Sequence, residues 1–360
     1  MHFDFLKSRA LAAALLAVVL LSAPQASAAA EKRLITETDL FDFKWIAGPQ
    51  ISPDGQHVVF VRVTVNEKKD GYDTALWIVG TDGKEPARQF TSGPRDGSPR
   101  WSPDGSRLAF ARAVEKDGKP QPPQIYVISL AGGEAVAVTD LPRGAGGPVW
   151  SPDGRTLAFT SGANEKDLAK QAREKDKDKD KAKAKEGEEE RESDVRVITQ
   201  ATYRFDGGGY DDPTRPNHIW TVAVPAPGAK ASEPKQITQG EFDEGGMDWS
   251  PDGSLLYFVS NRVKEPYYVA PDADLYSVAA GGGEIRRVVS IDGGIEDFSL
   301  SPDGKRIAFV GTLNANPTRS HNQTDLFVVD AAPGATAKNL TVDYDGDVGA
   351  GLAADQHPPR

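Results

Sequence analysis

The chain has 360 residues, enough for one large repeat domain or two ordinary domains. Its 36 glycines and 26 prolines, separated by short runs of valine, isoleucine and threonine, are typical of many strands and turns and argue against a helical bundle. A formal net charge of −11 argues against a nucleic-acid partner, which needs a clustered basic surface, and the lack of cysteine excludes disulfides.

The first 28 residues have the pattern of a secretory signal peptide. Lys7 and Arg9 form a basic start, and an apolar run from Leu11 to Leu21 follows it. The small residues of Ala26-Ser27-Ala28 then predict cleavage after Ala28, and hence a periplasmic or secreted protein. The alternative is a membrane anchor, but the apolar run is shorter than the roughly 20 residues that span a bilayer core. We therefore expect no membrane span after cleavage.

A Ser-Pro-Asp-Gly repeat dominates the rest of the chain. It begins at Ser52, Ser102, Ser151, Ser250 and Ser301. The spacing is close to 50 residues, except for one interval of twice that length between the third and fourth copies. Serine, proline and glycine suit successive corners of a tight turn. The motif therefore predicts a turn between two strands.

The strands around each turn predict an all-β fold. A strand precedes the motif, an apolar strand follows it, and a third strand starts about 24 residues after the serine, as at Leu76 and Ile125. A short fourth strand closes the unit, as at Arg88–Thr91 and Lys235–Thr238. Four strands in about 50 residues are typical of a β-propeller blade, so residues 34–360 predict a propeller of about five blades. A parallel β-helix and a helical solenoid do not fit this period.

Aromatic and acidic residues recur with the repeat. Trp101, Trp150 and Trp249 directly precede three of the motifs, and each motif carries an aspartate. Aromatic residues that recur once per blade are typical of blade packing rather than ligand binding. We therefore predict structural roles for the tryptophans and for the five aspartates.

The long interval holds an insertion in the third blade. Residues 165–194 include 22 charged residues out of 30, which predicts a disordered, solvated segment that is flexible or at most transiently helical. A partner-binding arm is the alternative. The stretch from Tyr203 to Tyr210 differs, because it combines aromatic residues and Arg204 with three consecutive glycines. We expect that stretch to be ordered and able to approach another surface closely.

The sequence contains no recognisable catalytic or cofactor-binding motif. No serine has glycine two residues before and two residues after it, so the G-x-S-x-G motif of α/β-hydrolases is missing, and the five histidines form no pattern. The acidic run from Asp343 to Asp347 fails as an EF-hand loop, because Val348 and Ala354 occupy the positions for glycine and glutamate. We expect no catalytic residue, no cofactor and no metal site in this chain.

Several segments resemble one known family. The repeats are similar to the WD40-like PD40 repeat, as in Phe258–Arg262 after the fourth motif. Leu34–Leu40 and Pro49–Gly55 resemble the N-terminal segment of bacterial prolyl oligopeptidase-family serine peptidases, in the acylaminoacyl-peptidase and dipeptidyl-aminopeptidase branch. Tyr203–Tyr210 with His218–Trp220 resembles the third-blade insertion of that branch. The resemblance implies a propeller that caps an α/β-hydrolase domain and admits short peptides to its serine.

The resemblance leaves two hypotheses. In the first, the chain is the substrate-gating propeller of an exported serine peptidase, truncated at Arg360 before its catalytic domain and inactive alone. Arg204, Asp206 and Tyr210 would then orient the substrate, with arginine pairing with a peptide carboxylate and aspartate with an amine. A surface pair between Arg204 and Asp206 is the alternative role for these two residues. In the second hypothesis, the chain is a stand-alone periplasmic TolB-like propeller that acts as a protein-interaction module. An incomplete propeller is also expected to self-associate through its open blade edges.

Overall fold

The computed structural model describes residues 33–348, apart from 94, 117, 180–194, 200, 202, 206–208, 227–228, 265–268, 270–271, 315–316, 318–321, 333 and 347. The predicted signal peptide lies outside the described residues. The chain divides into a unit that ends at Asp42 and a larger unit that starts at Phe43. In the described part of the first unit, the 3₁₀-helix η1 (Glu37–Asp42) follows Thr36, whose backbone N–H donates to Asp39 Oδ2 at 2.7 Å.

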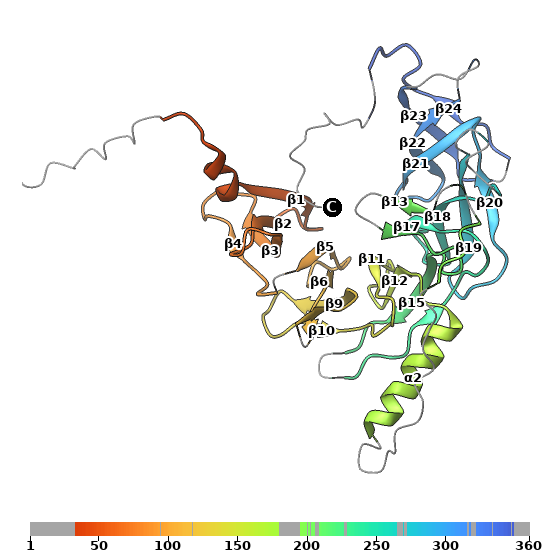
Figure 1. The fold of residues 1–360 in the computed structure, drawn as a ribbon. Helices are drawn as coiled ribbons and strands as arrows, with labels where there is room; N and C mark the ends of the chain where they lie inside the picture. Colours follow the sequence, from red (N-terminus) through yellow and green to blue (C-terminus); the bar gives the residue numbers. More distant parts are fainter. Residues whose placement is uncertain are drawn as a thin grey trace, which may run out of the picture. The chain divides into compact units, whose positions relative to one another are not determined.

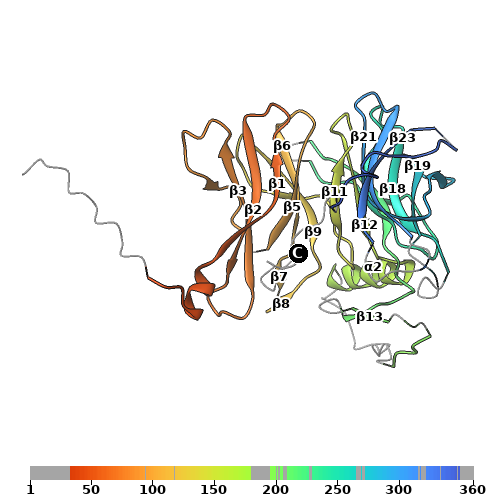
Figure 2. The ribbon, with the colours of Figure 1, turned by 90° about the horizontal axis from the view of Figure 1, so that it is seen from above.

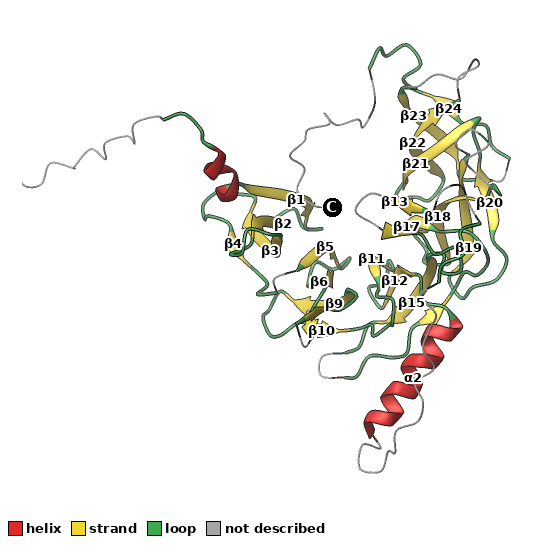
Figure 3. Ribbon diagram, viewed as in Figure 1, coloured by secondary structure: helices red, strands yellow, loops and turns green. Residues whose placement is uncertain are grey.

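The larger unit contains five antiparallel sheets of four strands each in its described residues (Figures 1 and 3). The first sheet comprises β1 (Lys44–Ile51), β2 (His57–Val65), β3 (Tyr72–Gly80) and β4 (Arg88–Gln89). The second comprises β5 (Asp96–Trp101), β6 (Arg107–Arg112), β9 (Gln124–Ser129) and β10 (Val136–Ala137). The third comprises β11 (Gly146–Trp150), β12 (Thr156–Ser161), β15 (His218–Ala223) and β16 (Lys235–Gln236).

The fourth sheet comprises β17 (Gly245–Trp249), β18 (Leu255–Asn261), β19 (Ala273–Ala279) and β20 (Arg286–Val289). The fifth comprises β21 (Gly293–Leu300), β22 (Arg306–Leu313), β23 (Thr324–Asp330) and β24 (Lys338–Asn339). A two-stranded ribbon, β7 (Glu115–Lys116) with β8 (Lys119–Pro120), connects β6 to β9. The prediction of an all-β protein with about five four-stranded blades is confirmed.

Each Ser-Pro-Asp-Gly motif forms the same turn between the first and second strands of a sheet. The glycine N–H donates to the serine carbonyl at 2.8 Å, and the serine hydroxyl donates to the aspartate at 2.5 to 2.6 Å. The five glycines have φ between 67° and 71°, a left-handed conformation that side chains disfavour. The predicted turn is therefore present in every sheet, and its aspartate is structural.

Successive turns also contact one another. A Cβ added to Gly304 would lie 3.2 Å from Pro251 of the preceding turn, and one added to Gly105 would lie 3.5 Å from Pro53. Gly154 and Gly253 approach Pro103 and Pro152 in the same way, at 3.6 Å. The left-handed backbone conformation is thus what favours glycine in all five turns, and only at Gly304 is the neighbouring turn also tighter than ordinary van der Waals contact.

The tryptophans before the motifs join each sheet to the preceding one. Trp150 Nε1 donates to the carbonyl of Arg100 at 3.0 Å, and the equivalent bonds run from Trp101 to Gln50 and from Trp249 to Val149. All three indole side chains are buried. Their predicted packing role is confirmed, because each satisfies its only polar atom on the neighbouring sheet.

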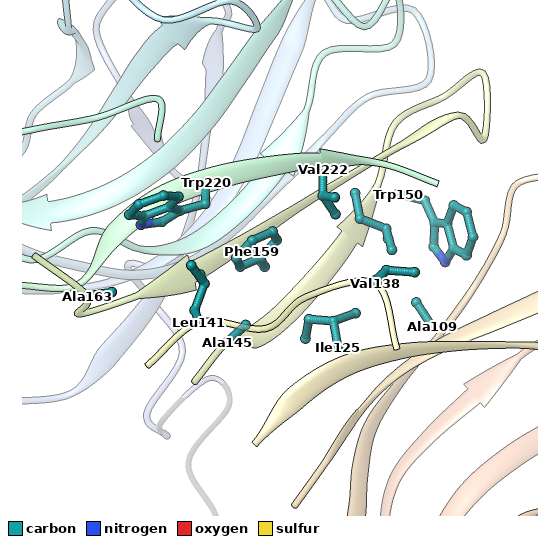
Figure 4. Close-up of a cluster of buried hydrophobic side chains, with 11 residues drawn as sticks. Ala109, Ile125, Val138, Leu141, Ala145, Trp150, Phe159, Ala163, Trp220 and Val222 are labelled. Carbon is teal, nitrogen blue, oxygen red and sulfur yellow. The ribbon is translucent and has the colours of Figure 1, made fainter. Parts of the chain in front are cut away.

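Apolar residues fill the space between successive sheets. Figure 4 shows the cluster between the second and third sheets, where Ala109 and Ile125 face Trp150, Phe159 and other residues of the third. Comparable clusters lie between the first and second, third and fourth, and fourth and fifth sheets. Within each sheet a phenylalanine of the second strand pairs with an aromatic residue of the third, as Phe309 does with Phe327, whose ring centroids are 5.0 Å apart. The core therefore consists of the apolar side chains packed between successive sheets.

The third-blade insertion is partly helical, which differs from the disordered segment predicted for residues 165–194. Helix α2 spans Glu165–Lys179, and residues 180–194 lie outside the described residues. Asn164 and Asp167 cap the helix reciprocally, each accepting a backbone N–H of the other. Asp167 also pairs with Arg215, whose Nε and Nη2 lie 3.0 and 3.2 Å away, and Leu168 packs on the core. These contacts stabilise the helix, which would not be expected from its highly charged sequence alone.

Candidate functional site

The insertion lies at the end of the sheets opposite the Ser-Pro-Asp-Gly turns. It connects β12 to β15, whereas the turns connect the first strands to the second strands, and strand direction alternates. Figure 2 accordingly shows α2 and β13 on the same side as the β7–β8 ribbon. Of the residues considered as substrate-orienting in the sequence, Arg204 and Tyr210 therefore lie at one defined end of the sheets.

Two of those three residues face each other in a small hairpin. Strand β13 (Arg204–Phe205) pairs with β14 (Gly209–Tyr210), and Arg204 lies opposite Tyr210. The N–H of Asp211 donates to the Tyr203 carbonyl at 2.9 Å, which closes the pair. The third residue, Asp206, lies outside the described residues, so its pairing with Arg204 stays a prediction.

The hairpin forms one wall of a surface hollow of about 400 Å³. The hollow is lined by Arg196, Ile198, Tyr203, Arg204, Gly209 and Tyr210. The Arg196 guanidinium lies over the Tyr210 ring, 4.5 Å from its centroid, in a cation–π contact. Both arginines are exposed, and within the described residues neither forms an ion pair with a carboxylate. The lining therefore combines two exposed cations with aromatic and aliphatic surface.

Among the described residues, acidic groups lie beside the hairpin rather than in the lining of the hollow. The pKa of Asp211 is raised by partial burial and then by the nearby Asp243 and Asp212 carboxylates. Asp212 is paired with Arg215, and Asp243 accepts the backbone N–H of Asn217 at 2.7 Å. The aspartates at this end therefore serve largely local structure.

Charged residues also occur on the first strands of three sheets. Each first strand contains a β-bulge, and in four of them the bulge includes a residue with positive φ: Gly48, Ser98, Gly147 and Gly246. Burial lowers the pKa of Arg100 and Asp297 opposes that shift, while burial and then Asp297 raise the pKa of Asp248. Asp297 of the fifth sheet thus interacts electrostatically with Arg100 of the second sheet and with Asp248 of the fourth.

Sequence reasoning missed a buried polar network between the third and fourth sheets. Glu244 accepts hydrogen bonds from Thr238 at 2.9 Å and from Arg262 at 2.6 Å, and lies 2.8 Å from His218 Nδ1. Glu244 and His218 are buried. The only signal was the presence of these residue types near strand ends, which is common in any β-protein. The network fixes the start of β15 against the loop before β17.

The described residues do not bring together a recognisable catalytic centre. Within them no serine hydroxyl bonds a histidine ring, and no group of three or more histidine or acidic residues is arranged to hold a metal ion. None of their helices is both long and apolar enough to cross a membrane.

Comparison with known proteins identifies the fold. The family model described as PD40, TolB beta propeller domain, matches residues 34–190. This chain contains a TolB-type propeller. Its repeats and four-stranded sheets are those expected of that domain.

The relatives of this propeller include peptidases. The uncharacterised peptidase YuxL of Bacillus subtilis is 32% identical over 236 residues, which cover 65% of this chain and 32% of YuxL. Dipeptidyl-peptidase 5 of Porphyromonas endodontalis is 25% identical over 293 residues, covering 76% of this chain and 38% of that protein. The chain thus spans about a third of the length of the curated relatives it matches.

A solved structure supports the same fold. The acylaminoacyl peptidase of Pyrococcus horikoshii matches with a TM-score of 0.55 and 16% identity, over 86% of this chain and 42% of that one. This likeness concerns the fold, whereas the relation to peptidases comes from the two sequence relatives.

Proposed function

We propose that this propeller is the substrate-gating portion of an exported serine peptidase that acts on short peptides. The observation that carries the proposal is the 32% identity to a peptidase over 236 residues, which are 65% of this chain.

Chemistry would come from a catalytic serine outside this chain, because the 360 residues contain no G-x-S-x-G motif. Peptide cleavage would then proceed through an acyl-enzyme, with the propeller restricting which substrates arrive. The basic and apolar N-terminal pattern supports export, with cleavage after Ala28.

The test uses the native polypeptide that carries this sequence. It would be isolated from its own cells with an antibody against the propeller, then analysed by mass spectrometry, N-terminal sequencing and labelling with a serine-directed fluorophosphonate. We expect an N-terminus at Ala29, a covalent label on a serine beyond residue 360, and hydrolysis that falls steeply as peptide substrates lengthen from 3 to about 30 residues. A polypeptide that ends at Arg360, takes no label and hydrolyses no peptide would contradict the proposal and favour a protein-interaction module.

Self-association is a further proposed partnership of this chain. Ile51 on β1 and Leu340 after β24 are 68% and 49% exposed, and both belong to the outer faces of the first and fifth sheets. Exposed apolar sheet surface favours association. Sedimentation velocity across a concentration series would detect it, and Ile51→Lys should reduce it.

A further inference from the structure

The hollow at the β13–β14 hairpin has the composition of an anion-binding site with an apolar wall. Arg196 and Arg204 contribute two positive charges, and none of the described residues that line the hollow is acidic. Ile198 and Tyr203 are 54% and 44% exposed, so apolar and aromatic surface remains accessible beside these charges. An accessible pair of arginines next to such surface favours a ligand that carries both an anion and an apolar group.

The cation–π contact orients one of the arginines. Because the Arg196 guanidinium lies over the Tyr210 ring at 4.5 Å, its planar face is occupied while its N–H edge can still donate. The cross-strand pairing of Arg204 with Tyr210 brings the second guanidinium to the same wall. A carboxylate accepts two parallel N–H donors from one guanidinium, which suits this arrangement.

We infer that the hollow binds the C-terminal carboxylate of a peptide, with Arg196 and Arg204 contacting the carboxylate and Ile198 and Tyr203 contacting the last side chain. The two arginines are the reason to expect an anionic ligand, whereas the expectation that this ligand is a peptide rests on the proposed function. The site would favour peptides with a free C-terminus and an apolar last residue over the same peptides with a C-terminal amide.

The test measures binding to the full chain by fluorescence anisotropy. The probes are the N-terminally dansylated peptide Ala-Ala-Ala-Phe as the free acid and the same peptide as the C-terminal amide. We expect the acid to bind about tenfold more tightly or better, because hydrogen bonds to a charged group contribute about that much. Arg196→Met and Arg204→Met should each lower the affinity for the acid toward that of the amide and leave the affinity for the amide unchanged.

Arg173→Met is the matched control, because Arg173 is an exposed arginine of α2 in the same insertion and does not line the hollow. It should bind both peptides like the parent chain. Circular dichroism and the urea midpoint should be the same for all three variants, so that a loss of binding reports the site rather than the fold.

Equal affinities for acid and amide, or an equal loss in Arg173→Met, would overturn the inference. Displacement of the peptide by inorganic phosphate and by acetate as effectively as by the free acid would reduce the hollow to a general anion site and overturn the peptide assignment. If only the proposed function were wrong, the chain would still bind the free acid more tightly than the amide, but its native polypeptide would hydrolyse no peptide. Conversely, hydrolysis with equal binding of acid and amide would retain the proposed function and exclude this site.

Discussion

Asp96 has no exposed side-chain surface and lies in the second sheet beside Arg112, which donates to it through Nε at 2.6 Å and Nη2 at 2.8 Å. The hydrogen bonds to Asp96 raise the pKa of Arg112, which favours its charged form. Arg112 also lies over the rings of Phe110 and Tyr126, at 5.1 Å from each. A side chain does not fit at Gly93, because an added Cβ would lie 2.5 Å from Asp96 Oδ1. A buried charge here is stabilised only by its complete set of partners.

Asp96→Asn should therefore destabilise the propeller strongly, because it leaves the partly buried Arg112 charge without its counter-ion. We expect a loss of about 3–5 kcal/mol in the free energy of unfolding, measured by urea denaturation. Arg286→Met is the control: its pair with Glu284 is about three-quarters exposed on both sides, and its loss should cost about 0–1 kcal/mol. Similar losses in the free energy of unfolding for the two variants would contradict the idea that burial makes the Asp96–Arg112 pair more important than an exposed pair.

At the level of elements, the Ser-Pro-Asp-Gly turn is the unit that repeats. Hydrogen bonds from the serine hydroxyl, and then from the backbone N–H two residues beyond the aspartate, hold the pKa of Asp104 and Asp252 at about 2, below the usual 3.8. The same causes lower the pKa of Asp54, Asp153 and Asp303. A carboxyl group whose pKa is lower in the folded than in the unfolded state stabilises the fold above its unfolded pKa. That stabilisation is lost as pH falls through the folded value.

The double substitution Asp104→Asn with Asp252→Asn tests this pH dependence. At pH 5–7 the variant should have a lower urea midpoint than the parent chain, and the difference should shrink between about pH 4 and pH 2, where the parent's aspartates take up protons. Glu85→Gln, at an exposed position outside the turns, should give no such converging curves. A difference that stays constant down to pH 2 would show that the carboxylate charge does not stabilise the turns.

At the scale of the whole molecule, side chains at equivalent positions of the repeat are buried to different extents, depending on whether another sheet packs against them. Trp101, Trp150 and Trp249 are 9%, 7% and 6% exposed against the preceding sheet, whereas Ile51 occupies the same position in the first sheet and is 68% exposed. After the fourth strands, Val138 is 1% exposed while the equivalent Leu340 is 49% exposed. The stability contributed by one repeat position therefore depends on the neighbouring sheet.

Trp150→Ala and Ile51→Ala should accordingly differ in this chain, although both remove a side chain at the same position of the repeat. We expect a loss of about 3–5 kcal/mol for Trp150→Ala, because it opens a cavity and removes a bond between sheets. Ile51→Ala should change stability by less than about 0.5 kcal/mol, as for an exposed site. Urea denaturation of the two variants side by side measures both values. A large loss for Ile51→Ala would mean that its side chain is covered in solution.

The sequence predicted the repeated features well and the single ones poorly. The turn at Ser102, the strand that ends at Trp150 and the packing role of its indole follow from local turn chemistry and a strict period. Helix α2 was missed because its stability comes from Asp167 pairing with Arg215, 48 residues away, and from Leu168 on the core. Arg196 was missed as a site residue because it adjoins a charged run, and only the folded hairpin brings it over Tyr210.

The amino-acid sequence by itself determined the turn, the four strands and the period of each blade, since these depend on backbone preferences within about 50 residues. The tertiary structure decided which repeat positions are buried, which charges are paired and which arginines share the hollow at the hairpin. Those outcomes depend on contacts between residues distant in the chain, and identical motifs meet different neighbours. Ile51 and Trp150 occupy the same position in the repeat, yet only Trp150 has another sheet packed against it.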